Sequence, residues 1–198
     1  YEGYGLSETT AAATVNTLSS RELGTVGRAL ECTEIKIVDA EGEEVKTGER
    51  GELVMRGPQV MVGYWQQPDA TKAVLDSDGW LKTGDIAIKQ ANEHIRIVDR
   101  INDMILVSGF NVFPTEIENV VYSFPGIVEC AVVGMPDDRT GEAVQLFVVT
   151  DDTTITEEKL VAYCRSQIAA YKVPKYIVFK DELPKSNVGK ILRRELRT

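Results

Sequence analysis

The chain has 198 residues, of which 43% are hydrophobic and 27% charged, an ordinary composition for a soluble globular protein. Its formal net charge of −9 argues against bulk nucleic-acid binding, which usually requires a basic domain. No run of about 18 apolar residues occurs and no signal peptide opens the chain, so no membrane span is encoded. This length suits one large or two small domains.

Cysteine and histidine are scarce. Cys32, Cys130 and Cys164 are odd in number and far apart, so they predict neither a disulfide framework nor a zinc site and favour a reducing, cytosolic setting. Each falls among apolar residues, which predicts a small buried side chain. His94 is the single histidine, which excludes a histidine-based triad or a multi-histidine metal site within these residues.

The first 17 residues are rich in glycine and hydroxyl side chains. Gly3 and Gly5 free the backbone, Ser7 offers a hydroxyl and Glu8 a carboxylate. Backbone amides and hydroxyls can hold phosphate oxygens, whereas a carboxylate needs a cation between. Glu8 therefore indicates a Mg²⁺ ligand if phosphate binds here. The alternative is a plain loop, which such clusters usually form.

Residues 34–98 have the pattern of short strands divided by turns. Residues 34–39 and 52–56 alternate apolar and polar side chains, and a short helix is predicted to begin near Pro68. We expect a small antiparallel β subdomain. Within it, Asp85 follows a glycine on a tight turn, where a carboxylate can accept two hydrogen bonds from a ribose. The alternative, favoured by this stretch alone, is that Asp85 caps its turn.

The segment 95–118 joins the two halves of the chain. An apolar strand ends at Val98, the polar segment Asp99–Asp103 follows, and a second apolar run starts directly afterwards. A few polar residues between rigid units are typical of a hinge. Beyond them, Gly109 permits a positive φ or the close approach of a ligand, and Pro114 suits the first turn of a helix.

An α+β unit is predicted after the hinge. Apolar residues recur with helical spacing over 117–124, residues 127–134 and 144–150 are rich in β formers, Thr156 is a candidate N-cap, and 176–179 predicts another strand.

Near the C-terminus, Gly189 beside Lys190 permits an exposed loop that projects an ammonium group. A mobile lysine is suited to neutralising charge on a phosphoryl centre. The surrounding segment 172–198 is rich in lysine and arginine, which on an acidic chain indicates a phosphate-bearing small ligand. A solvated basic face is the alternative.

Four motifs taken together resemble the adenylate-forming superfamily of acyl-CoA synthetases, most closely the bacterial long-chain fatty-acid CoA ligases. They are YGLSETT (4–10), GWLKTGD (79–85), DRINDMILVSGFNVFPTEIE (99–118) and LPKSNVGKILRREL (183–196). The resemblance covers essentially the whole chain in the family's order and spacing. Such enzymes carry a large N-terminal region with most of the acyl pocket, so we expect a C-terminal fragment.

The resemblance implies a role for particular positions. It places the ATP and AMP contacts at Gly3, Tyr4, Gly5, Ser7, Asp85, Arg100 and Asn111. Within that set, Tyr4 lies at the adenine face and Asp85 meets the ribose hydroxyls with help from Arg100. Glu8 takes the Mg²⁺. Lys190 is the catalytic lysine that contacts the carboxylate and the α-phosphate.

The resemblance also implies the positions that serve CoA and domain rotation. Ser108 and Gly109 match positions beside the pantetheine of CoA. Asn102 stands at the hinge position, which is usually Asp or Lys in the family. Asparagine tolerates unusual backbone angles, so rotation is not forbidden. An uncharged asparagine does not form the hinge salt bridge with which Asp or Lys could favour one of the two orientations of the C-terminal domain.

The expected fold class is α+β. Residues 1–99 would form the end of the large AMP-binding domain with a small, distorted barrel-like antiparallel β subdomain. Residues 100–103 would form the hinge, and residues 104–198 a mobile α+β domain with a short antiparallel sheet.

The implied reaction is ATP-dependent conversion of a fatty acid into an acyl-adenylate, followed by transfer to CoA. One alternative is an adenylation domain that loads a carrier protein, although no carrier domain begins after Lys190. A noncatalytic nucleotide-binding module would predict loss of Lys190, Glu8 or Asp85, all of which are present.

The expected partners are the small substrates fatty acid, ATP and CoA, with no nucleic acid, and the expected location is the cytoplasm. Peripheral inner-membrane association, oligomeric state and acyl length stay open.

Overall fold

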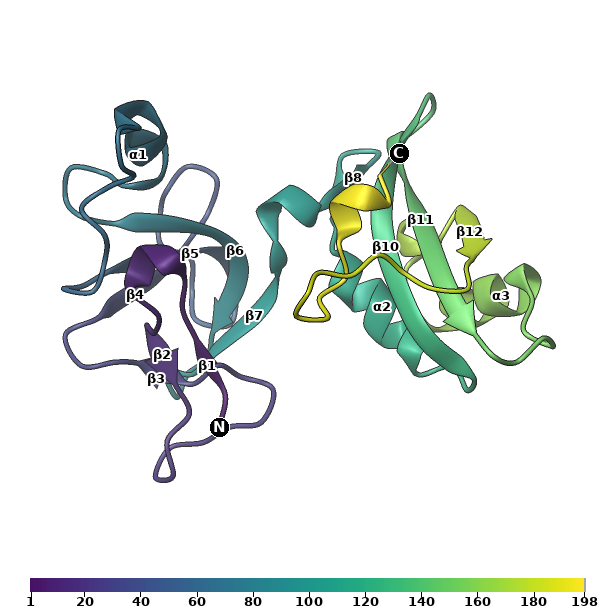
Figure 1. Cartoon of the computed structure of the whole chain (residues 1–198), viewed down its shortest axis with the longest axis horizontal. Coiled ribbons are helices and arrows are strands. Elements are labelled where there is room, and N and C mark those ends of the chain that lie inside the picture. The colour runs from purple at the N-terminus through teal and green to yellow at the C-terminus, as the bar shows by residue number, and fades with distance from the viewer. Residues whose placement is uncertain (198) are drawn as a thin grey trace. The chain divides into compact units, whose positions relative to one another are not determined.

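The computed structural model describes residues 1–197 and divides into two compact units, Tyr1–Ile101 and Asn102–Thr198. Figure 1 shows them as the purple-to-teal and the green-to-yellow parts of the chain. The fold is α+β with mainly antiparallel sheets, which confirms the predicted class. No helix in residues 1–197 has the length and apolar character needed to cross a bilayer.

The first unit contains two antiparallel sheets. A small one has the order β1 (Gly3–Tyr4), β2 (Thr14–Val15) and β3 (Arg28–Ala29). The larger one has the order β4 (Glu34–Val38), β5 (Arg50–Arg56), β6 (Leu81–Lys89) and β7 (Ile95–Arg100). β4 and β7 are its edges, so among the described strands this sheet stays open and does not close into a barrel.

The core of this unit follows from the alternation of its strands. Ile35 on β4 pairs with Met55 on β5, and Ile37 with Leu53, so the apolar sides of both strands meet on one face. Leu53, Met55, Leu81 and Ile95 are at most 1% exposed. Helix α1 (Pro68–Val74) begins with proline at its first turn, as predicted.

The second unit has a five-stranded sheet. Its main order is β10 (Ile127–Asp137), β11 (Gly141–Thr150), β8 (Ile105–Val107) and β9 (Phe110–Val112). β12 (Tyr176–Phe179) also pairs with β11, and it runs parallel to it because helix α3 (Glu157–Gln167) carries the chain back between them. The β10–β11 hairpin is longer than predicted, since strand pairing extends through the charged residues on both sides of its turn.

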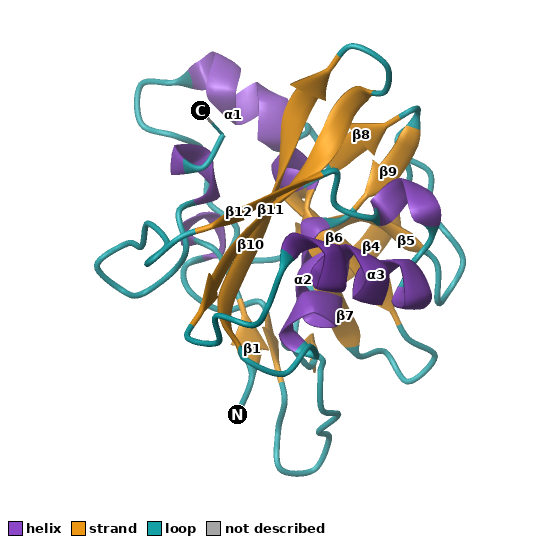
Figure 2. Cartoon of the chain, turned by 90° about the vertical axis from the view of Figure 1, so that its right-hand side faces the viewer, coloured by secondary structure: helices purple, strands orange, loops and turns teal. Residues whose placement is uncertain are grey.

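The two faces of this sheet carry separate cores. Helices α2 (Pro114–Tyr122) and α3 pack with Cys130, Val132, Leu146 and Val148. Figure 2 shows these helices beside the strands. The intervening residues of β10 and β11 form a second cluster with two leucines near the end of the chain. Its members are Ala131, Val133, Phe147, Val149, Leu183 and Leu196.

The predicted burial of cysteine is right for two of the three residues. Cys130 and Cys164 are buried, and burial raises the pKa of both thiols. Cys32 is exposed, so the prediction is wrong there. It lies in the turn between β3 and β4 with φ of 62°, and this reversal of the chain turns it away from the apolar strand residues that follow.

Thr156→Ala should lower the free energy of unfolding by about 1 kcal/mol. The Thr156 hydroxyl oxygen accepts a hydrogen bond from the Lys159 N–H at the start of α3, as an N-cap does, and alanine leaves that N–H without a protein partner. Chemical denaturation would measure the loss. Thr153→Ala is the matched control, because Thr153 is an exposed threonine in the loop before this helix. Equal effects of the two substitutions would contradict the capping role.

Candidate functional site

Three of the predicted nucleotide-site residues meet in the first unit. The Tyr4 hydroxyl donates a hydrogen bond to Asp85 Oδ2 at 2.5 Å, and Arg100 Nε lies 3.5 Å from Asp85 Oδ1. Strand pairing creates the second contact, since Asp85 on β6 and Arg100 on β7 are direct partners. The Asp85 carboxylate therefore contacts two other strands, and the turn-capping alternative does not describe it.

The environment of this cluster is partly buried. Asp85 is 5% exposed, whereas the Arg100 side chain is 68% exposed. Burial, reinforced by the hydrogen bond to the Asp85 carboxylate, raises the pKa of the Tyr4 phenol, so Tyr4 stays a hydrogen-bond donor at neutral pH. Each Asp85 oxygen has a second lone pair, and this leaves capacity to accept hydrogen bonds from a ligand.

The backbone beside Tyr4 is packed closely. A Cβ at Gly5 would lie 1.6 Å from the Ala11 carbonyl oxygen, so only glycine fits. Gly3 lies opposite Val15 in the small sheet. Ser7 is exposed and starts the 3₁₀ helix Ser7–Thr9. The structure thus explains Gly5 by close approach of the backbone, and it leaves the hydroxyl of Ser7 open to solvent.

Glu8 lies on the same short helix, and its carboxylate has a protein partner that the sequence did not reveal. The Tyr64 hydroxyl donates a hydrogen bond to Glu8 Oε1 at 2.7 Å, and this contact raises the pKa of Tyr64. The Met61 N–H also donates to the Glu8 carbonyl oxygen at 2.8 Å. Within residues 1–197, no cluster of three or more acidic, histidine or cysteine side chains could hold a metal ion. Any metal at Glu8 would need ligand atoms from a substrate or water.

In the second unit, Ser108 and Gly109 form the turn of the β8–β9 hairpin. Their φ angles are 50° and 84°, as two-residue hairpin turns with left-handed residues require. A Cβ at Gly109 would meet no atom within 4 Å, so this side of the turn is open. Asn111 is exposed on β9, one residue after Phe110, whose ring stacks on Tyr171 with centroids 4.8 Å apart.

Lys190 is exposed on a narrow loop, as predicted. Strand-like pairing of Lys185 with Ile191 closes the loop, and the Gly189 N–H donates to the Ser186 carbonyl oxygen at 2.8 Å. Gly189 has φ of 79°, which supplies the tight turn. The base is fixed by an ion pair between Lys185 and Glu129 and by burial of Leu183.

Asn102, the predicted hinge position, is hydrogen-bonded to the end of the chain. The Asn102 carbonyl oxygen accepts a hydrogen bond from Arg197 Nη1 at 3.1 Å, and the Asp103 carboxylate pairs with both Arg193 and Arg197. Arg193 also binds Glu118 on α2, with Nη2 2.7 Å from Oε2. Sequence reasoning missed these partners; the arginine-rich end of the last motif was the only signal that could have indicated them.

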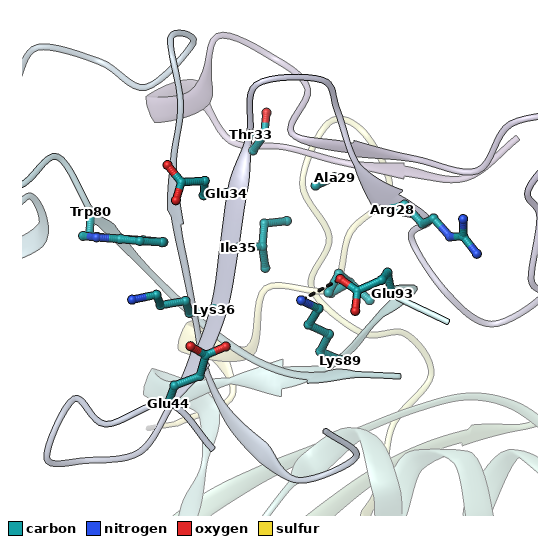
Figure 3. A pocket seen from close by; sticks show the side chains of 11 residues that line it. Arg28, Ala29, Thr33, Glu34, Ile35, Lys36, Glu44, Trp80, Lys89 and Glu93 are labelled. Carbon is teal, nitrogen blue, oxygen red and sulfur yellow. Dashed lines mark ion pairs between the residues drawn. The ribbon is translucent and has the colours of Figure 1, made fainter. Parts of the chain in front are cut away.

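The first unit also contains an open pocket of about 480 Å³ that none of the predicted site residues line (Figure 3). Lys89 and Glu93 form an ion pair there, and the Lys36 ammonium lies 4.5 Å from the centre of the Trp80 ring. The charges that line this pocket are therefore largely satisfied by neighbouring side chains.

The chain matches two family models and is similar in sequence to known enzymes. The family model described as AMP-binding enzyme matches residues 1–65, and the model described as AMP-binding enzyme C-terminal domain matches residues 116–190. A long-chain-fatty-acid CoA ligase of Escherichia coli O157:H7 is 56% identical over 197 residues, which are 99% of this chain. A feruloyl-CoA synthase of Amycolatopsis is 41% identical over 199 residues. The chain spans 35% and 40% of the lengths of these two relatives.

Solved structures are also similar to this chain over nearly its whole length. ATP-bound MatB from Rhodopseudomonas palustris superposes with a TM-score of 0.95 at 36% identity, covering 99% of this chain and 39% of that one. The o-succinylbenzoate CoA synthetase MenE from Bacillus subtilis, in complex with its acyl-adenylate, gives 0.88 at 32% identity, covering all of this chain and 40% of that one. MatB without ligand gives a TM-score of 0.71 at the same 36% identity and coverage.

Tyr4→Phe should flatten the loss of stability at high pH. Because the pKa of Tyr4 is raised in the folded chain, the unfolded chain loses this phenol proton first as the pH rises through about 10. The contribution of Tyr4 to stability is fully present below that pH. Above it, the free energy of unfolding falls by up to about 1.4 kcal/mol per pH unit.

Free energies of unfolding measured from about pH 8 to about pH 12 would show the difference in slope. Asp85→Asn should flatten the slope in part, since the carboxylate contributes to the raised pKa. Parallel curves for wild type and Tyr4→Phe would show that Tyr4 is not responsible.

Proposed function

This chain belongs to the AMP-binding enzyme family, and on that premise we propose that it is part of an ATP-dependent fatty-acid CoA ligase. The observation that carries the proposal is the 56% identity to a long-chain-fatty-acid CoA ligase, sustained over 197 of the 198 residues. The reaction has two steps. A fatty-acid carboxylate attacks the α-phosphorus of ATP and releases pyrophosphate, and the thiol of CoA then attacks the acyl carbonyl and releases AMP.

The first unit would bind the nucleotide. Asp85 accepts hydrogen bonds from the ribose hydroxyls, and the contacts with Tyr4 and Arg100 hold its carboxylate in one orientation. The adenine would lie against Tyr4, whose neighbour Gly5 allows the following loop to pack closely behind it. The backbone of Gly3 and the hydroxyl of Ser7 would complete the contacts, and Asn111 would reach AMP from the second unit.

Glu8 fits a magnesium ion that arrives with ATP. Mg²⁺ usually takes one or two protein carboxylates and obtains its other ligands from substrate phosphates and water. Glu8 supplies one such carboxylate, with Oε1 oriented by Tyr64 and Oε2 available. The bound ion would neutralise phosphate charge during adenylation.

The second unit would supply a different group for each step. Lys190, exposed on the loop that Lys185 and Ile191 close, would neutralise the charge that develops as the carboxylate attacks the α-phosphate. The Ser108–Gly109 turn would form one wall of the CoA channel, where the open side of Gly109 lets the pantetheine pass close to the backbone. Rotation about Asn102 would exchange these two faces, and the boundary between the two compact units at Ile101 and Asn102 supports a hinge there.

Assay of the full-length protein for pyrophosphate release across a panel of carboxylates would test the proposal. Medium- and long-chain fatty acids should support release with ATP and Mg²⁺, and CoA should then convert the product into a thioester. o-Succinylbenzoate and ferulate are informative alternative substrates, because the names of two relatives contain these acids. No release with any fatty acid, or release only with an aromatic acid, would contradict the fatty-acid assignment.

Lys190→Ala in the full-length protein should reduce adenylation at least about 100-fold, as expected for loss of a charge that stabilises the transition state. Formation of acyl-CoA from supplied acyl-adenylate should persist, because the lysine would serve only the first step. Separate assays of pyrophosphate release and thioester formation would distinguish these effects. Val188→Ala, at an exposed position of the same loop, is the control. Equal loss of both steps would argue against the role.

Asn102→Pro should impair thioester formation more than adenylation. Proline restricts its own φ and disfavours the helical conformation of the preceding residue, here Ile101 in the 3₁₀ helix Ile101–Asp103. Single-turnover CoA transfer would measure the effect, with Asn102→Asp as a control that leaves the backbone free. An unchanged transfer rate for the proline variant would remove the hinge from the mechanism.

A further inference from the structure

The turn Ser108–Gly109 is held by a second turn about thirty residues later in the chain, between β10 and β11. The Ser108 N–H donates a hydrogen bond to the Thr140 carbonyl oxygen at 2.8 Å. The Leu106 N–H donates to Glu142 Oε2 at 2.7 Å, and Gly141 pairs with Val107 between these two contacts. The β10–β11 turn therefore sets the position of β8 and of the first residue of its turn.

The carboxylate of Asp137 organises the β10–β11 turn. Asp137 Oδ1 accepts hydrogen bonds from the N–H groups of Arg139 and Thr140, each at 3.1 Å, and lies 2.8 Å from the Thr140 hydroxyl. Asp137 Oδ2 binds the Lys175 ammonium. The Asp137 side chain is only 5% exposed. Oδ1 of this carboxylate thus holds the N–H and the hydroxyl of Thr140, while Oδ2 anchors the carboxylate to Lys175.

The protonation state of Asp137 suits this role. The hydrogen bond from Lys175, followed by that from the Thr140 hydroxyl, holds the pKa of the Asp137 carboxyl well below its usual range. The carboxylate is therefore charged at neutral pH, and charge-assisted hydrogen bonds are stronger than neutral ones.

Ser108 needs such support because of its backbone. Its φ of 50° lies in the left-handed region, which costs energy for a residue with a side chain. A strained residue keeps its conformation only where the surroundings over-determine it. The Thr140 carbonyl supplies that restraint on one side of the turn. On the other side, the ring of Phe110, which follows Gly109, rests on Tyr171.

We propose that Asp137 is a positioning residue for the thioester-forming step, acting through the Thr140 carbonyl to hold the Ser108–Gly109 turn where the thiol of CoA must pass. The inference rests on the proposed function. Asp137 touches neither reacting group, and its effect is transmitted by two hydrogen bonds. The adenylation step uses Lys190, on a separate loop, so it should not depend on Asp137.

The test compares Asp137→Asn with Asp138→Asn in the full-length protein. Asparagine keeps the size of Asp137 but removes its charge and places an amide N–H₂ where Lys175 or a backbone N–H now donates. Asp138 is an exposed carboxylate in the same turn and is the matched control. Asp137→Asn should slow CoA transfer from acyl-adenylate about 10- to 100-fold, the scale of a small misplacement of reacting groups. Pyrophosphate release without CoA should keep its wild-type rate.

Two further measurements separate positioning from a general loss of structure. Hydrogen exchange of the peptide covering residues 104–111 should be faster in Asp137→Asn and unchanged in Asp138→Asn, because the Ser108 N–H loses a fixed acceptor. Thr140→Ser keeps the hydroxyl and should transfer acyl groups as wild type does, whereas Thr140→Val should repeat the defect in milder form.

The outcomes distinguish the two hypotheses. Wild-type CoA transfer by Asp137→Asn, or equal loss of both steps, would overturn the positioning role and leave the proposed function intact. A wild-type protein that adenylates fatty acids but transfers nothing to CoA would overturn the proposed function, and the positioning role with it.

Discussion

The arrangement of the second unit depends on the guanidinium of Arg193. It binds Glu118 on α2 through two nitrogens and Asp103 through a third, and thereby joins the helix, the last residue of the predicted hinge and the end of the chain. Glu118 is 9% exposed and also accepts the Val132 N–H of β10 at 2.9 Å. The Arg193 side chain is 25% exposed and that of Glu118 11%, so removing one partner would leave a partly buried charge without its counter-ion and destabilise the unit. The interaction therefore fixes where the Lys190 loop ends relative to α2 and β10.

Much of the fold followed from local patterns. The alternation of Ile35 and Ile37, the proline that starts α1 and the threonine that caps α3 each describe a physical requirement that involves only near neighbours. The length of the β10–β11 hairpin did not follow, because it depends on pairing between charged residues that no periodicity marks as strand. The exposure of Cys32 was missed for a similar reason, since a turn overrides the apolar character of its neighbours.

The candidate site could be predicted only where the type and position of a single residue indicate its chemistry. A carboxylate after glycine and a lysine after glycine could be singled out, but their partners could not. Tyr64 reaches Glu8, and Tyr4 reaches Asp85, across 56 and 81 residues of sequence. Only the folded chain brings these groups together, and the same holds for the contact between Thr140 and Ser108.

The segment that carries Lys190 is also a layer of the fold. Leu183 and Leu196, on either side of the lysine loop, cover the face of the sheet that the helices leave bare, together with the partly buried Ile191. Deleting or replacing this segment would expose Phe147 and Val149 to water as well as removing an ammonium group. The Lys190 loop is thus coupled to the smaller of the two hydrophobic cores of the second unit, so a chain of this type cannot simply lose the loop and keep its shape.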